Sequence, residues 1–168
     1  LYGLCENSSG LVANGDASLT GTASATTNVT ASSTGTASDD VATADSEVQN
    51  VIGIDADASG VLIDVEGDLT ANGSATASQT ATAGLNTGNA TADIDGTSVI
   101  GAAYDTTGTD GINAAGDATV SGAATVVNAA TAETTTGTAT ATEDVATVAG
   151  LIDDLTVGGD ATLNGTAS

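Results

Sequence analysis

The 168-residue chain contains no Lys, Arg, His, Pro, Met, Phe or Trp, and it has only one Cys and two Tyr. Most hydrolytic and group-transfer enzymes use His, Lys or an activated Cys as base or nucleophile. The carboxylate pairs Asp39/Asp40 and Asp153/Asp154 could nominally serve glycoside hydrolysis. Adjacent residues of a strand point to opposite faces, however, and almost no aromatic side chain is available to bind a sugar ring. We therefore expect a non-catalytic protein without a cofactor, with Ca²⁺ as the one ion to consider.

The lack of positive side chains leaves 22 acidic residues and a formal net charge of −22. Binding to nucleic acid and to anionic membrane surfaces depends on Lys and Arg, so we expect neither partner. No apolar run reaches the length of a membrane-spanning helix, and the chain begins without the basic segment of a signal peptide. Self-repulsion would be relieved by an elongated shape, by salt or by Ca²⁺. These conditions favour an extracellular or cell-surface location for a processed or interior piece.

A Gly-Asp segment occurs four times, at intervals of 52, 49 and 43 residues, in the ranges 15–24, 67–76, 116–125 and 159–168. A second marker, Val-Ile-Gly or Val-Ala-Gly, keeps step with it in the ranges 51–53, 99–101 and 148–150. Two independent markers in register predict a repeat of about 49 residues.

The repeat divides the chain into a leader and successive units. We predict an N-terminal leader or donor strand over 1–14, repeat 1 over 15–66, repeat 2 over 67–115, repeat 3 over 116–158, and the start of repeat 4 over 159–168. The last copy stops after its opening motif, without the atypical capping segment that usually ends a repeat array. We therefore expect a window of a longer array.

Within the repeats, small or β-branched residues alternate with period two, as in Val61, Ile63 and Val65. This alternation, with Gly-Asp, Asn-Gly and Ser-Gly as turns, predicts an all-β protein. Ala, Thr and Gly make up just over half of the chain, which suits the thin interior of a parallel β-solenoid with two or three coils per unit. A β-sandwich filament subunit whose residues 1–14 are donated to a neighbour is the alternative fold. The 3.6-residue spacing of Val41, Ala44, Val48 and Val51, with Gly53 as a stop, also allows a short helix there.

The segments Gly-Asp-Leu-Thr-Ala-Asn-Gly-Ser-Ala-Thr (67–76) and Gly-Gly-Asp-Ala-Thr-Leu-Asn-Gly-Thr-Ala-Ser (158–168) resemble the repeats of very large bacterial surface proteins. These proteins are of the β-strand-repeat or filamentous-haemagglutinin-like type. The acidic composition is similar to that of secreted proteins of marine cyanobacteria, although the complete absence of Lys and Arg is extreme. The resemblance implies a β-rich, extracellular protein with a structural or adhesive role, and it implies no catalytic residue.

One twelve-residue segment fits the pattern of a calcium-binding loop. Its oxygen ligands would be the side chains of Asp55, Asp57, Ser59 and Glu66 and the carbonyl of Val61, with Gly at the sixth position. The exiting helix of such a loop is missing, because the following residues have a strand pattern. A solvated acidic turn is the alternative interpretation.

The threonine ladder Thr136, Thr138, Thr140 and Thr142 would suit an ice-binding face only if successive coils were equally spaced. Because the intervals of 52, 49 and 43 residues are unequal, they do not predict equal spacing. We therefore expect these side chains to lie on the solvated side of a strand.

Five Asn-X-Ser/Thr sequons begin at Asn7, Asn28, Asn72, Asn89 and Asn164 and are candidate glycosylation sites. The single cysteine, Cys5, excludes an internal disulfide. It is a free thiol, an intermolecular bridge or an incidental residue.

These patterns favour a structural segment of an extracellular filament or giant cell-surface protein, whose partners are copies of itself or neighbouring repeats. Two alternatives remain open. One is a pilus-like subunit that polymerises by strand exchange, and the other is a Ca²⁺-dependent adhesin.

Overall fold

A computed structural model describes residues 2–5, 11–34, 36–48, 50–55, 63–95, 98–104, 112–144, 147–153 and 155–168. These residues contain strands and turns and no helix, which confirms the all-β prediction. The strands are β1 (Tyr2–Cys5), β2 (Leu11–Ala13), β3 (Ala17–Ser33), β4 (Val41–Glu47), β5 (Val51–Asp55), β6 (Ile63–Val65), β7 (Leu69–Asp95), β8 (Ser98–Tyr104), β9 (Ile112–Ala114), β10 (Ala118–Glu143), β11 (Thr147–Asp153), β12 (Leu155–Val157) and β13 (Ala161–Ala167).

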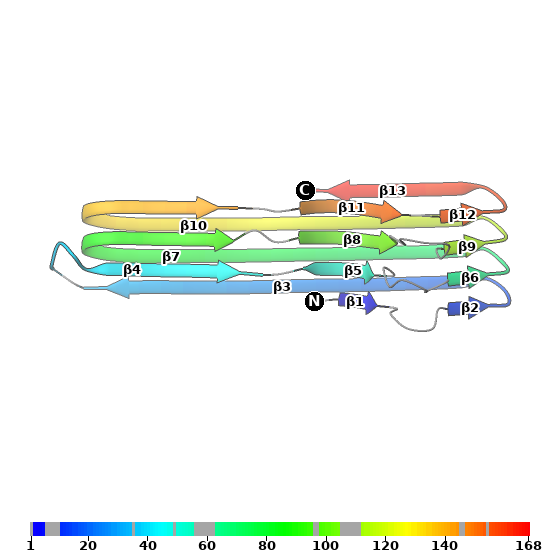
Figure 1. Cartoon of the computed structure of the whole chain (residues 1–168), viewed down its shortest axis with the longest axis horizontal. Helices are drawn as coiled ribbons and strands as arrows, with labels where there is room; N and C mark the ends of the chain where they lie inside the picture. Colours follow the sequence, from blue (N-terminus) through cyan, green and yellow to red (C-terminus); the bar gives the residue numbers. More distant parts are fainter. Residues whose placement is uncertain are drawn as a thin grey trace.

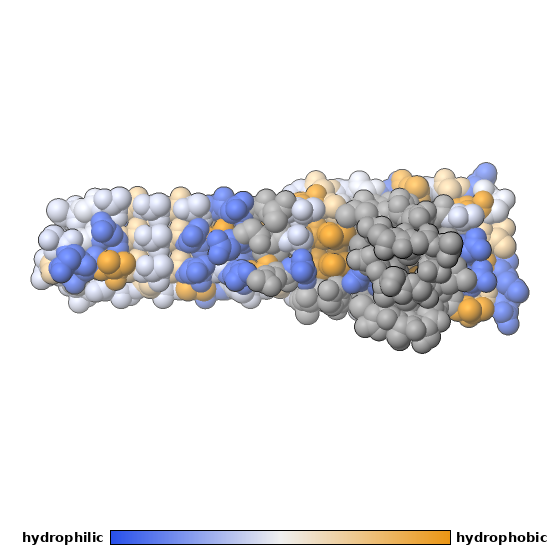
Figure 2. Space-filling model, viewed as in Figure 1, coloured by the Kyte–Doolittle hydropathy of each residue, from blue (hydrophilic) through white to orange (hydrophobic). Residues whose placement is uncertain are grey.

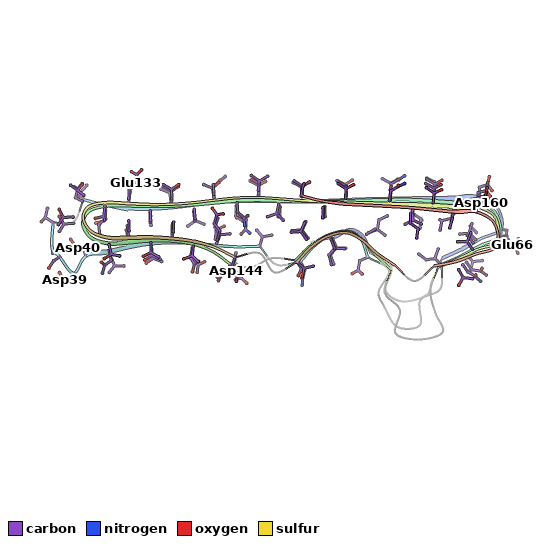
Figure 3. The ribbon with its side chains drawn as sticks, turned by 90° about the horizontal axis from the view of Figure 1, so that it is seen from above. Asp39, Asp40, Glu66, Glu133, Asp144 and Asp160 are labelled. Carbon is purple, nitrogen blue, oxygen red and sulfur yellow. The ribbon has the colours of Figure 1, made fainter. Side chains whose placement is uncertain are left out.

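The strands form three parallel sheets in an elongated body, and all of them run along its long axis (Figure 1). The first contains β1, β5, β8 and β11, and the second contains β2, β6, β9 and β12. The third and largest contains β13, β10, β7 and β3, with β4 pairing the second part of β7. Strands β7 and β10 bend back on themselves, so the molecule has two layers with a narrow interior (Figure 3).

Corresponding residues of the Gly-Asp segments pair directly across the largest sheet. Ala17 pairs with Leu69, Leu69 pairs with Ala118, and Ala118 pairs with Ala161. Each of the predicted repeats 1 to 3 therefore contributes one strand to each sheet, except that repeat 1 contributes two strands, β3 and β4, to the largest sheet. The expectation of two or three coils per unit is wrong, because β7 and β10 are 27 and 26 residues long and one pass uses the whole unit.

Differences in unit length fall outside the paired strands. The register offset is 52 residues between β3 and β7 but 48 between β4 and β7, so four extra residues lie in the turn from β3 to β4. The offset is 49 between β8 and β11 but 43 between β9 and β12, so the connection from β11 to β12 is six residues shorter. The strands consequently remain in register although the intervals between units differ.

The alternative helix around residues 41–51 is wrong, because these residues supply β4 and the start of β5. Ala42, Ala44 and Ser46 are buried, whereas Val41 and Thr43 are exposed. Burial at every second residue therefore identifies this segment as a strand, although its larger apolar residues have the 3.6-residue spacing of a helix.

The interior holds three separate apolar clusters along its length, centred on Leu69, Val51 and Ile94. A row of polar side chains lies between the last two: Gln79 and Ser46 are buried, and the Ser46 hydroxyl contacts the Thr27 hydroxyl at 2.6 Å. Asn128 continues this inner row in register with Gln79. No described residue hydrogen-bonds its buried side-chain amide.

Between the first two clusters, the backbone of one layer lies directly against the backbone of the other. A Cβ atom on Gly73 would overlap the carbonyl oxygen of Gly101, and one on Gly101 would overlap the backbone nitrogen of Ala123. Gly21 meets the carbonyl of Gly53 in the same way. The glycine of the Val-Ile-Gly marker is therefore the contact partner of the second glycine in the Gly-Asp segment. Both markers are explained by this one close approach, which only residues without a side chain allow.

The N-terminal segment is paired within the chain. Strand β1 pairs with β5, and β2 pairs with β6, in the same parallel sense as the later strands of those sheets. These residues occupy the positions that a preceding unit would fill.

We predict that Gly73→Ala lowers the free energy of unfolding by at least about 2 kcal/mol, because the new methyl group forces the layers apart. Gly84→Ala is the matched control on the same strand, where a Cβ atom meets nothing within 4 Å. The control should leave stability unchanged or raise it slightly. Urea unfolding followed by circular dichroism measures both, and equal effects of the two substitutions would contradict the glycine contact.

Candidate functional site

The Gly-Asp turns form a hydrogen-bonded row along one end of the stack. The Oδ1 atom of Asp16 accepts the backbone N–H of Asp68 at 3.0 Å. Asp68 in turn accepts from Asp117, and Asp117 accepts from Asp160, each at 2.9 Å. Each carboxylate thus ties its own turn to the turn of the next unit.

The glycine before each aspartate is part of the same arrangement. A Cβ atom on Gly67 would overlap the Oδ1 atom of Asp16, and one on Gly116 would overlap Oδ1 of Asp68. Gly supplies the space and Asp supplies the acceptor, so the dipeptide acts as one structural unit. The row has a structural role, because every bond in it joins side chain to backbone of the same chain.

A second group of carboxylates lies on the layer that carries β4. Asp45 pairs with Asp93 and Glu47 pairs with Asp95 in register, and Asp144 follows at the end of β10. Repulsion from Asp93 raises the pKa of Asp95 above its usual value of 3.8, with smaller contributions from desolvation, Asp45, Glu47 and Asp144. Figure 2 shows hydrophilic side chains gathered on this face of the molecule. Within the described ranges, no three His, Cys, Asp or Glu residues are placed to hold a metal ion.

The predicted calcium loop falls largely outside the described residues. Asp57, Ser59 and Val61 are not described, while Asp55 ends β5 and Glu66 is exposed in the turn after β6. The metal site therefore stays a prediction.

The sequon asparagines that the structure describes are all exposed: Asn28, Asn72, Asn89 and Asn164. Asn72 accepts a hydrogen bond from the Ser121 hydroxyl of the neighbouring strand. Asn7 lies outside the described residues. Exposure agrees with glycan attachment, which stays a prediction.

The remaining candidate side chains are dispersed. Cys5 ends β1 in register with Asp55. Asp40 accepts the backbone N–H of Ala37 at 3.0 Å and so closes its own turn. Asp153 ends β11, and its predicted partner Asp154 lies outside the described residues.

A hollow of about 640 Å³ lies where β7 and β10 bend. It is open, and its walls are mainly small or polar, with Leu85 as the largest apolar side chain. Glu133 is the one ionisable residue among those that line it. This arrangement offers no pair of groups for acid–base chemistry.

The feature that sequence reasoning missed is the outer face of the largest sheet, which we call the hydroxyl face. It consists of the outward side chains of β3, β7, β10 and β13 from the Gly-Asp turns as far as Thr30, Thr82, Thr131 and Ser168, and none of the 22 acidic residues is among them. Its members are Ser18, Thr20, Thr22, Ser24, Thr26, Asn28, Thr30, Thr70, Asn72, Ser74, Thr76, Ser78, Thr80, Thr82, Thr119, Ser121, Ala123, Thr125, Val127, Ala129, Thr131, Thr162, Asn164, Thr166 and Ser168. Glu133 is the next outward residue of β10 and lies beyond this face (Figure 3).

The threonine ladder singled out from the sequence lies elsewhere. After the bend at Gly137, Thr138 pairs with Asn89 and Thr142 pairs with Asp93, so these threonines adjoin the acidic layer. Aligning the four Gly-Asp segments would have located the hydroxyl face, because its ranks start at the residue two positions after each Asp.

We predict that Asp68→Ala lowers the free energy of unfolding by about 1 kcal/mol, because it leaves the Asp117 N–H without its acceptor. Asp68→Asn keeps an oxygen acceptor and should retain most of the stability. Urea midpoints of the two variants and the parent chain test this. Equal losses from Asn and Ala would show that the charge of Asp68, and not its acceptor oxygen, is what matters.

We predict that stability rises as pH falls towards 3.8, because Asp95 is protonated more readily in the folded chain than in the unfolded one. This contribution favours folding below its ordinary pKa and is lost as pH rises through the raised value. Asp95→Asn should therefore stabilise the chain at neutral pH and make no difference below pH 3.8. Glu133→Gln, at the end of the opposite layer (Figure 3), is the control and should have a smaller effect. Urea midpoints against pH that fall on acidification would contradict the prediction.

In the part of the chain that the structure describes, there is no helix with the length and apolarity needed to span a bilayer. Comparison with protein-family models, with curated proteins and with solved structures finds no match to this chain. Its function is therefore inferred from its own residues and their arrangement.

Proposed function

We propose that the chain is a structural, non-catalytic segment of an extracellular filament or giant cell-surface protein, built as a parallel β-solenoid of coils of about 49 residues. The observation that supports this best is the register of the largest sheet, in which each Gly-Asp segment pairs with the next at equivalent residues. An array that adds one unit per turn can be extended without changing its cross-section.

The geometry suits a load-bearing role. Backbone hydrogen bonds run along the stacking axis through long strands, and the Asp row adds one side-chain bond per unit. The interior is filled mainly by Ala, Val, Ile and Leu, with one polar row at Gln79 and direct glycine contact. Stiffness therefore comes from the backbone ladder and requires no large aromatic core.

The charge supports an extracellular setting. With 22 carboxylates and no positive side chain, neighbouring fibres repel one another unless salt screens them or divalent cations bridge them. Both conditions are met in saline surroundings. The resemblance to large bacterial surface proteins agrees with this location.

The alternatives have weaker support. A strand-exchanging pilus subunit would need residues 1–14 for a neighbour, whereas β1 and β2 already pair with β5 and β6. A Ca²⁺-dependent adhesin would need the loop between Asp55 and Glu66, most of which the structure does not describe.

An antibody raised against this chain tests the proposal on native material that has not been digested. We expect a band far above 15.7 kDa and immunogold label along surface filaments. Antibody absorbed with the purified chain is the control. A band near 15.7 kDa with label inside the cell would overturn the proposal, and the same band with label in pili would favour strand exchange.

A further inference from the structure

The carboxylates are distributed unevenly over the two layers. The layer of β4 presents Asp45, Glu47, Asp93 and Asp95 on neighbouring strands, whereas the hydroxyl face has no ionisable side chain. Its boundaries are acidic: the Asp row, which ends at Asp160, lies at one end and Glu133 at the other (Figure 3). In a chain of net charge −22, this leaves one broad neutral surface.

The hydroxyl face is also regular in two directions. Ser18, Thr70, Thr119 and Thr162 form one rank across four strands, and every second residue along the strands starts another rank. Side-chain contacts join neighbouring strands within a rank, as between the Thr125 and Ser168 hydroxyls at 3.3 Å. The unequal unit lengths do not disturb this order, because the extra residues lie in the connections.

The face is flat as well as regular. Figure 3 shows its strands nearly superposed along their length, with side chains in evenly spaced ranks. Parallel strands lie about 4.8 Å apart, and alternate residues of one strand lie about 6.6 Å apart. The 17 residues of β3 therefore span about 55 Å at about 3.3 Å per residue. Most positions bear a hydroxyl, which both donates and accepts hydrogen bonds; the exceptions are Asn and the small apolar residues Ala123, Val127 and Ala129.

We propose that the hydroxyl face binds the surface of ice. The ligand must itself be flat, uncharged and periodic on the scale of a few ångströms, and it must offer donors and acceptors over tens of ångströms. The oxygen lattice of solid water has these properties. Ranks of hydroxyls at fixed spacing can hold first-shell waters in positions that continue this lattice.

Other occupants fit the face less well. A second copy would gain little from burial, because the side chains are small and mostly polar. A crystalline polysaccharide would be expected to stack on aromatic rings, and the two tyrosines, Tyr2 and Tyr104, belong to β1 and β8 of another sheet. Ice needs neither apolar burial nor an aromatic platform.

The test uses the full 168-residue chain made in bacteria without N-glycosylation, because Asn28, Asn72 and Asn164 lie on the face. Thermal hysteresis and partition into a slowly growing ice hemisphere are measured against albumin at equal concentration. We expect hysteresis and enrichment in ice for the parent chain. If thermal hysteresis and enrichment in ice are no greater than those of albumin, the proposal is overturned.

Two matched substitutions locate the activity. Thr76→Tyr places a bulky ring in the centre of the hydroxyl face and should abolish most of the hysteresis. Thr91→Tyr makes the same change on the same strand, in the opposite layer beside Thr43 and Thr140, and should leave it unchanged. Urea midpoints establish that both variants fold. Equal loss or equal retention in the two variants overturns the assignment to this face.

Sedimentation and pull-down experiments with the same proteins separate the other occupants. If the parent chain shows no hysteresis but sediments as a dimer, and Thr76→Tyr makes it a monomer, then the hydroxyl face binds a second copy of the chain and not ice. Retention on insoluble chitin or cellulose without hysteresis would replace ice by a polysaccharide. Neither result bears on the proposed filament, which rests on the mass and location of the native material.

Discussion

The parallel backbone ladder is the interaction on which the rest of the structure depends. The chain has few large apolar side chains, so a compact core of the usual kind is not available to it. Strands as long as β7 satisfy their backbone groups against both neighbours and bring the two layers so close that Ala fills most of the gap. Where even Ala is too large, glycines face one another, as Gly73 and Gly101 do. Small side chains are thus a requirement of the narrow interior.

Register connects the ladder to the surface. Because equivalent residues pair from unit to unit, any side chain that recurs in the sequence becomes a row in space. The row is favourable for Asp68, whose Oδ1 atom accepts a backbone N–H of the next unit. The same rule brings Asp93 next to Asp45, and the repulsion is visible in the raised pKa of Asp95. An in-register stack amplifies good and bad contacts alike. Among the acidic residues that the structure describes, Glu133 alone lies outside the turns on the layer of the hydroxyl face (Figure 3).

The all-β class and the parallel pairing of the Gly-Asp segments could be predicted, because alternation and repetition are local properties of the sequence. The glycine contact could not, because it joins the two markers across the interior and depends on the distance between layers. The helix expected near Val48 is wrong because Ala42, Ala44, Ser46 and Val48 are buried at every second position, whereas Val41, the first residue of the helical spacing, is exposed. The threonine ladder at Thr136–Thr142 is exposed on its strand, as the sequence predicts, but the bend at Gly137, which carries it to the acidic layer, could not be predicted from the alternation. The predicted calcium loop at Asp55–Glu66 is not tested by the structure, because most of its residues lie outside the described ranges.

The placement of length variation links the proposed filament to the hydroxyl face. A load-bearing array tolerates units of 52, 49 and 43 residues, provided that the paired strands keep their register. A periodic face demands the same condition more strictly, since one unpaired residue within β7 would turn every later side chain to the other side. Insertions at the turn before β4 and the deletion before β12 respect both demands. The chain therefore keeps constant the segment that carries the neutral ranks and varies only the connections.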